Sequence, residues 1–168
     1  MQARRLNPEP QPPLFDIYLR VRHPYLDPAT ISHELQLPAE HSYRAGEARD
    51  GRAGAAGASV HSESCWLASL QPASWPASSV GGGASGEQSR AGQINEALAR
   101  DPGAALAMCT MFLRRHAAFL QQITREGGEI HLRIALDAAS ADGFTLAPQH
   151  MGLLSELAIA LDIEFDER

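Results

Sequence analysis

The chain has 168 residues, a formal net charge of −6 and 44% hydrophobic residues, which are the proportions of one soluble domain with a single core. It contains no lysine, and its arginines are dispersed, so the composition argues against nucleic-acid binding. No apolar run reaches the length of a membrane span or follows an export signal. With two cysteines outside any metal-binding spacing, the sequence predicts a cytoplasmic protein without a cofactor.

The first predicted element is a strand over residues 15–22, FDIYLRVR, which follows a flexible proline-rich tail at residues 1–14. Apolar and polar residues alternate strictly along it, which is the pattern of a strand with one buried face. The residues expected to point inward are Phe15, Ile17, Leu19 and Val21, and those expected to point outward are Asp16, Tyr18, Arg20 and Arg22.

A short helix is predicted to follow. Asp27 suits the cap position, where its carboxylate accepts hydrogen bonds from the first turn, and Pro28 suits the first helical position. Pro38 should end this helix, because a proline disfavours helical geometry in the residue before it. An extended segment at residues 43–44 and a turn at Gly46 come next.

The middle of the chain alternates loose and ordered segments. Residues 47–64 and 71–92 are rich in Gly, Ala and Ser and predict loose loops, and residues 65–70 between them predict a strand. A long helix should run from Asp101 to about Glu126, after a short one near residues 94–99. Its apolar stripe comprises Leu106, Cys109, Phe112, Leu113, His116, Phe119, Leu120 and Ile123.

Three elements remain at the C-terminal side. Residues 129–137 alternate like the first strand, with His131 and Arg133 on the polar side, and a turn is expected at residues 142–143. A third helix should begin near Pro148, preceded by Ala147 where a serine cap is more usual. A last strand is predicted near residues 161–167. Leu146 and Met151 are expected to form a hydrophobic staple at the start of this helix. The residues expected to point inward from this unit are Leu154, Leu157, Leu161, Ile163 and Phe165.

The predicted order is β-α-β-β-α-β-α-β. We therefore expect an α+β domain over residues 15–168, with a mainly antiparallel sheet and helices on one face. The first six elements fit a ferredoxin-like β-α-β-β-α-β core, to which a helix and a strand are added. A different α+β topology with the same elements stays open, because strand order is not visible in the sequence.

Several of these stretches resemble the bacterial family known as domain of unknown function 4279. The resemblance lies in LDPATISHELQLPAEHSYRAGE, in CWLASL, in the long helix that ends before a glycine, and in the TLAP helix with LDIEF. It covers most of residues 15–166 outside the two loops. It implies a fold and a bacterial origin, and it carries no known activity or catalytic residues.

Catalytic and metal sites find little support in the spacing of residues. The seven histidines include no pair at metal-ligand spacing, so no metal site is predicted. Two nucleophile–base pairs stay open, Cys65 with His131 and Cys109 with His116, although neither has a loop motif beside it. The acidic residues of the last strand are interpreted as solvated side chains of the sheet, and acid–base chemistry is the alternative.

The best candidate site is the polar side of the predicted sheet. It would bring together Tyr18, Arg20 and Arg22 with His131 and Arg133, a set suited to a carboxylate, a phosphate or an acidic protein segment. The competing interpretation is a solvated face whose arginines are balanced by Asp16 and by the acidic last strand through cross-strand ion pairs. Our functional prediction is a non-catalytic module that binds a protein partner or a second copy of itself. An anion- or small-molecule-binding domain is the alternative, and an enzyme with a Cys or His nucleophile is the third.

Overall fold

The computed structural model describes residues 15–49, 59–71, 101–137 and 145–166. The predicted tail, the short helix near residues 94–99 and the turn at 142–143 lie outside these residues, as does most of the two predicted loops. The elements are β1 (Phe15–His23), α1 (Pro28–Leu35), β2 (His41–Tyr43), β3 (Ser64–Ser69), α3 (Pro102–Arg115), α4 (Ala117–Arg125), β4 (Glu129–Asp137), α5 (Pro148–Glu156) and β5 (Ile159–Asp166).

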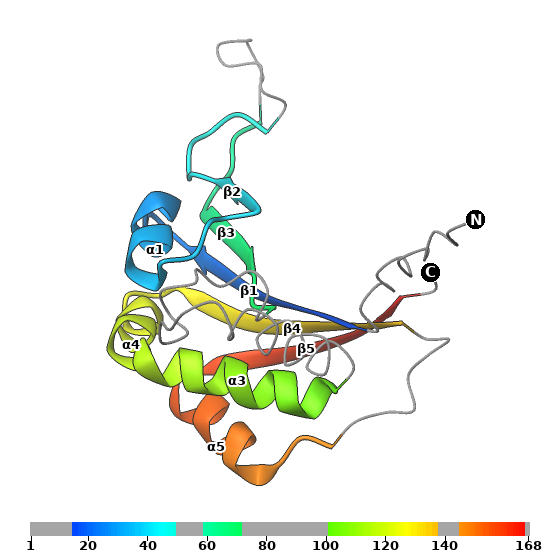
Figure 1. Cartoon of the computed structure of the whole chain (residues 1–168). Helices are drawn as coiled ribbons and strands as arrows, with labels where there is room; N and C mark the ends of the chain where they lie inside the picture. The colour runs from blue at the N-terminus through cyan, green and yellow to red at the C-terminus, as the bar shows by residue number, and fades with distance from the viewer. Residues whose placement is uncertain (1–14, 50–58, 72–100, 138–144, 167–168) are drawn as a thin grey trace, which may run out of the picture.

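One five-stranded sheet organises the molecule, in the order β2-β3-β1-β4-β5 (Figure 1). β1 is antiparallel to both β3 and β4, and β2 is antiparallel to β3, whereas β5 is parallel to β4. The predicted α+β class is confirmed, and the sheet is mixed. As a whole it differs from a four-stranded ferredoxin-like sheet, because β5 continues it beyond β4.

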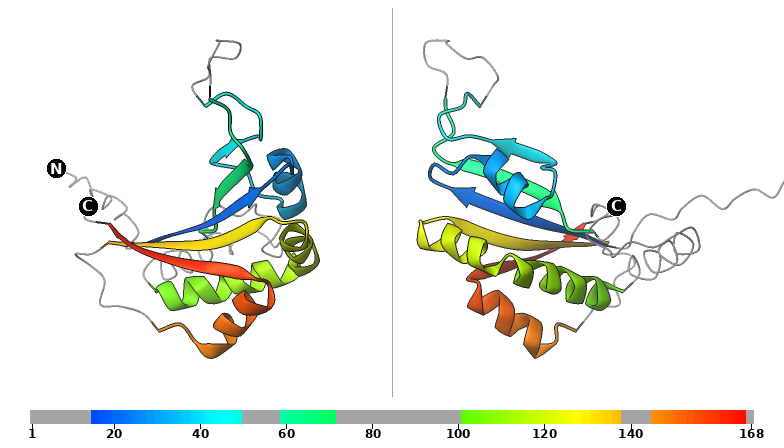
Figure 2. Two further views of the ribbon diagram at one scale, coloured as in Figure 1. Left: turned by 180° about the vertical axis from the view of Figure 1, so that it is seen from behind. Right: turned by 60° about the vertical axis from the view of Figure 1, so that its left-hand side comes forward.

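The hydrophobic core lies on one face of this sheet, as the alternation of β1 and β4 predicted. The inward-facing residues of both strands are buried, and they form one cluster with apolar residues of the helices. Figure 1 shows α3, α4 and α5 on one side of the strands, and in the right-hand view of Figure 2 α1 and α4 lie in front of them. The strand residues in the cluster are Phe15, Ile17, Leu19, Val21, Trp66, Ala68, Ile130, Leu132, Ile134, Leu136 and Ile159.

Two of the predicted helix caps are present. The Asp27 carboxylate accepts from Ala29 N at 2.9 Å, and the Asp101 carboxylate accepts from Gly103 N and Ala104 N at 2.9 and 3.1 Å. Ala147 at the start of α5 makes no side-chain cap bond, which confirms the weaker start expected there.

The end of α1 differs from the prediction. The helix stops at Leu35, before the expected boundary, because Gln36 adopts a left-handed conformation with φ of 53°. The amide of Leu37 then donates back to Ser32 O at 3.2 Å, as in a helix that ends with a left-handed residue. The helix therefore ends at Gln36, before Pro38 can have an effect on it.

The long helix is also interrupted. It divides into α3 and α4 at His116, whose φ of −104° and ψ of 15° leave the helical region. No glycine or proline marks this position, and the apolar stripe continues across it with Leu113 and Leu120 both buried. The break lets α3 pack against α5 while α4 packs against β4, so tertiary packing decides a bend that the periodicity did not predict.

A buried histidine shapes the corner between β1 and α1. His23 is 1% exposed, and its Nδ1 accepts from the amides of Tyr25 at 3.2 Å and Leu26 at 2.9 Å. Its Nε2 is buried without a hydrogen bond in the described part of the chain and lies 3.9 Å from the Glu126 carboxylate. Desolvation lowers the pKa of His23, so the neutral ring is the form that fits this corner.

Gly128 allows the chain to pass close to this ring. A Cβ at Gly128 would lie 2.7 Å from the His23 ring and 2.6 Å from the Ile123 side chain. The preceding Gly127, with φ of 88°, takes the left-handed turn that ends α4. The two glycines that follow α4 thus serve different purposes, since Gly127 adopts the left-handed conformation and Gly128 leaves room for the His23 ring.

Candidate functional site

The five predicted site residues share the sheet face opposite the helices, which we call the polar face. Tyr18 lies directly opposite Arg133 across the β1–β4 pair, and Arg20 lies opposite His131. Arg22 continues the same side of β1 and faces Glu129. Because neighbouring residues in a ladder point to the same side, the structure confirms that the set is brought together.

Acidic side chains accompany each of the three arginines on this face. Arg22 is hydrogen-bonded to Glu63 through Nε at 2.8 Å and also lies 3.5 Å from Glu129. Arg133 is paired with Glu164 of β5. The bond to Glu63 raises the pKa of Arg22. These contacts are the cross-strand ion pairs that the competing interpretation expected, and they reduce the attraction of the face for a free anion.

At the centre of the polar face, the arginine is hydrogen-bonded less completely than at its ends. Asp162 of β5 accepts from His131 Nδ1 at 2.9 Å, and the same oxygen lies 3.6 Å from Arg20 Nη2. The Nε of Arg20 is buried and has no hydrogen-bond partner among the residues described. Arg20 is therefore the arginine of this face with donor capacity left over.

A second cluster, at the β2 end of the polar face, was missed by sequence reasoning. The turn at Gly46, with φ of 82°, returns the chain so that the His61 ring stacks on Tyr43, with 3.6 Å between ring centroids. Tyr43 lies opposite Cys65 in the ladder. Burial, and then contact with the Cys65 thiol, raises the pKa of Tyr43. Gly46 was the one available signal, since the stacking partners are far apart in sequence.

Neither proposed nucleophile–base pair is assembled. Cys65 and His131 lie on β3 and β4 with β1 between them, which separates their strands by about 10 Å. Cys109 is fully buried, its Sγ lies 3.5 Å from Leu70 O, and burial raises the pKa of its thiol to about 12. The His116 ring packs on Phe112 instead. The structure therefore keeps Cys65 and His131 apart and places Cys109 in the core.

The outer strand β5 holds the largest departure from the predicted core. Ile163 and Phe165 were expected to point into the core, yet they are 45% and 66% exposed, whereas Ile159 at the start of the strand is buried. The strand runs on beyond α5, as the left-hand view of Figure 2 shows, so the helix covers only its first half. Met151, expected to form a staple at the start of α5, is 56% exposed, and Leu153 of the same helix is buried.

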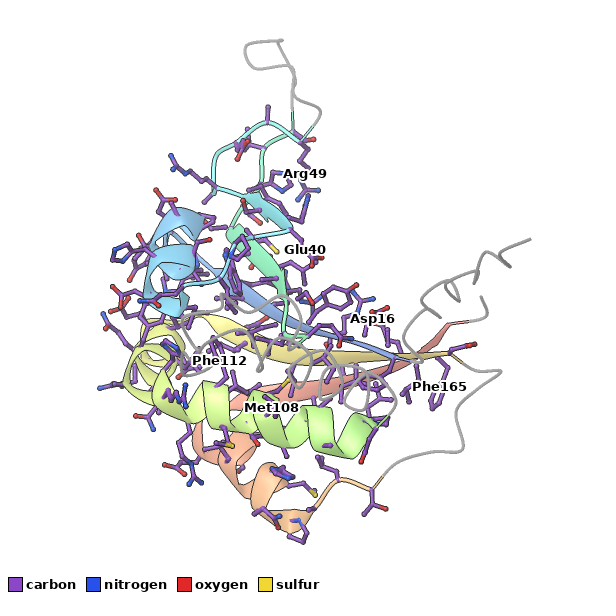
Figure 3. The ribbon with its side chains drawn as sticks, in the orientation of Figure 1. Asp16, Glu40, Arg49, Met108, Phe112 and Phe165 are labelled. Atoms are coloured by element: carbon purple, nitrogen blue, oxygen red, sulfur yellow. The ribbon has the colours of Figure 1, made fainter. Side chains whose placement is uncertain are left out.

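Figure 3 places this exposed end of β5 relative to the polar face. Phe165 and Asp16 lie at the same end of the sheet and point to opposite sides of it. Asp16 lies on the polar face, in a row that runs through Ala135 to Glu164. This end of the molecule therefore carries acidic residues on one side of β5 and an exposed apolar pair, Ile163 and Phe165, on the other.

Within the described ranges, no three His, Cys, Asp or Glu side chains are grouped as metal ligands would be. In the same residues, no helix combines the length and the apolar character needed to cross a membrane.

No family model matches the chain, and no curated protein or solved structure shows significant similarity to it. The resemblance to domain of unknown function 4279 therefore stays a prediction.

Proposed function

We propose that the protein is a cytoplasmic, non-catalytic interaction module that adds an extended segment of a partner protein to the outer edge of β5. The observation that carries this proposal is the exposed apolar pair, Ile163 and Phe165, on an edge strand of eight residues. Strand addition uses backbone hydrogen bonds from an edge and side-chain contacts at alternate positions, and β5 offers an edge position in the described sheet with exposed apolar residues at 163 and 165.

The sequence of β5 supports the proposal, because it lacks the usual protections of an edge. Natural edge strands carry lysine, proline or a bulge, or they are very short. β5 contains no proline, and its eight residues pair one-to-one with β4 without a bulge. Its acidic residues Asp162 and Glu164 contact arginines of the sheet interior. An apolar, regular and long edge is typical of a surface that another strand covers.

The proposal can be tested with two matched variants. Ile163→Thr with Phe165→Ser removes the apolar pair, and Met111→Ser removes an apolar side chain that is 62% exposed on α3. Binding of a library of short extended peptides should be lost in the β5 variant and kept in the α3 variant. Amide chemical shifts of residues 159–166 should change when a peptide binds. Equal binding by both variants, or shifts confined to other elements, would contradict the proposal.

A second candidate function is anion binding at Arg20, favoured by its buried Nε and its long 3.6 Å contact to Asp162. A phosphate or carboxylate would supply the missing acceptor. Inorganic phosphate or citrate should then raise the melting temperature of the protein by mass action. The rise should vanish in Arg20→Ala and persist in Arg133→Ala, whose arginine is already paired with Glu164. A rise that survives both substitutions would remove this candidate.

For the fold, we propose that β1 to β4 with α1, α3 and α4 form a ferredoxin-like unit extended by α5 and β5. Two observations support this proposal. In the sheet, β2, β3, β1 and β4 lie next to one another in that order, and each adjacent pair is antiparallel. The parallel strand β5 is then an addition at one edge, which is the edge where the proposed partner segment binds.

A further inference from the structure

The two faces of β5 impose different chemistry on whatever pairs with its edge. Asp162 and Glu164 lie on the polar face, and Ile163 and Phe165 lie on the helix-covered side of the sheet beyond the reach of α5. Directly opposite side chains in adjacent strands point to the same face and touch. A segment added at β5 therefore needs one row of side chains suited to carboxylates and one row suited to apolar neighbours.

The two carboxylates retain capacity for new partners. In the part of the chain that the structure describes, Asp162 makes its contacts to His131 and Arg20 through Oδ2 alone, and Glu164 contacts Arg133 through Oε2. The side chains of Asp162 and Glu164 are 34% and 44% exposed. Because an ionised carboxylate accepts about four hydrogen bonds, each can take a donor from outside the sheet.

The charges around the β5 edge favour one sign of charge in the side chains of a partner segment. Asp16 lies in the same cross-strand row as Glu164, and the whole chain carries a net charge of −6. Arg133 is already paired with Glu164. Basic side chains would therefore be attracted to this end of the sheet, and acidic ones repelled.

The same charges disfavour a second copy of β5 as the occupant. An antiparallel pairing of two β5 strands that brings their Ile163 and Phe165 together places Asp162 opposite Glu164, or Glu164 opposite itself. Like charges directly opposite each other destabilise a strand pair. Self-association at this edge would gain apolar contact and lose electrostatic energy.

We infer that the partner segment is a strand in which arginine or lysine alternates with apolar residues. Its basic row contacts Asp162 and Glu164, and its apolar row covers Ile163 and Phe165. This inference rests on the proposed binding at the β5 edge, and it adds the chemical class of the partner.

The test uses three synthetic peptides of equal length and identical apolar positions, whose alternate positions carry arginine, glutamine or glutamate. Binding to the full chain is measured by fluorescence anisotropy at low and at physiological salt. The arginine peptide should bind about fivefold more tightly than the glutamine peptide, the size of effect that two half-exposed ion pairs produce. The glutamate peptide should bind most weakly, and added salt should reduce the differences.

Variants separate this inference from the function on which it rests. Asp162→Asn with Glu164→Gln should abolish the preference for arginine. Glu156→Gln, at an exposed position of α5, should leave that preference intact. If the arginine and glutamine peptides bind equally and Ile163→Thr with Phe165→Ser weakens both, the partner class is overturned and edge binding stands. If no peptide binds and residues 159–166 show no shifts, both fail. A dimer that dissociates on Phe165→Ser would replace the basic partner with a second copy.

Discussion

The two edges of the sheet are built in opposite ways. At one edge β2 has only three residues, and the chain beyond it is held by backbone bonds such as Gly46 N to His61 O at 2.8 Å. Arg44, just after β2, is paired with Asp27 at the start of α1 at 2.8 Å. At the other edge β5 has eight residues and ends in exposed Ile163 and Phe165.

This difference distinguishes an edge that is protected against pairing with another strand, at β2, from an edge with less protection, at β5. Short edge strands and side-chain contacts are protections against unwanted strand pairing. The short strand is found at β2, whereas β5 has eight residues and makes its side-chain contacts toward the sheet interior through Asp162 and Glu164. We therefore expect substitutions near β2 to act mainly on stability, and substitutions at the end of β5 to act mainly on binding.

The largest expected effect comes from Trp66, which lies on β3 next to β2. It is fully buried, and its indole N–H donates to the Ser32 hydroxyl at 2.8 Å. Trp66→Ala should lower the free energy of unfolding by about 3–5 kcal/mol, because it leaves a large cavity. Urea denaturation measures this value. A loss below about 1 kcal/mol would mean that the β2 side of the sheet is not held as described.

The next effect is a pH dependence that originates at His23, at the corner leading to α1. The folded-state pKa of His23 is lowered by desolvation, below about 6.5 for an unfolded histidine. The contribution of neutral His23 to the free energy of unfolding is thus complete above about pH 6.5, and it is lost as the pH falls toward the folded-state pKa. The pKa of His116 is lowered too, by desolvation and then by Arg115, so acid destabilises through both rings.

The substitution His23→Asn isolates the contribution of this corner. An asparagine oxygen can accept from the amides of Tyr25 and Leu26 without titrating. Urea denaturation between pH 7 and pH 5 should then show a shallower loss of stability than in the wild type, with the remainder due to His116. An unchanged slope would show that His23 does not titrate in this range.

A smaller effect concerns the helix caps beside the two edges. Asp27→Ala removes the cap of α1 and its contact with Arg44, and it should cost about 1 kcal/mol. Ala147→Ser supplies the cap that α5 lacks, and it should add about 0.5–1 kcal/mol. Thermal unfolding of both variants checks the opposite signs. Two changes of the same sign would contradict the described asymmetry.

The smallest expected effect on stability is that of Phe165→Ala. The ring is 66% exposed, so its removal should change the free energy of unfolding by no more than about 0.5 kcal/mol. Chemical denaturation of this variant beside Trp66→Ala gives the direct contrast between the two edges. A cost near that of Trp66 would show that Phe165 belongs to the core and would remove the argument for an open edge.

The sequence predicted much of the sheet because alternation is a local property. Phe15 to Arg22 and Ile130 to Arg133 could be assigned to faces from their spacing alone, and this placed Tyr18 beside Arg133 correctly. The caps at Asp27 and Asp101 are equally local. What alternation cannot predict is how far a helix extends along a strand, and for this reason Ile163 and Phe165 were wrongly assigned to the core.

Other misses have the same non-local origin. The bend at His116 depends on what α3 and α4 contact, and no residue there breaks a helix. The stacking of His61 on Tyr43 needs the return of the chain after Gly46. The acidic partners of Arg20 and Arg133 come from β5, as the competing interpretation expected, although the position of β5 beside β4 could not be inferred from the sequence.

The parallel pairing of β4 with β5 has a consequence during synthesis. β5 reaches β4 only after the crossover through α5, so residues 129–137 emerge from the ribosome well before residues 159–166. Until β5 pairs, β4 is itself the edge of the sheet, and the backbone groups that β5 later engages stay open. A fragment that lacks residues 159–166 would therefore leave the edge of β4 open to pairing with other strands, which favours aggregation.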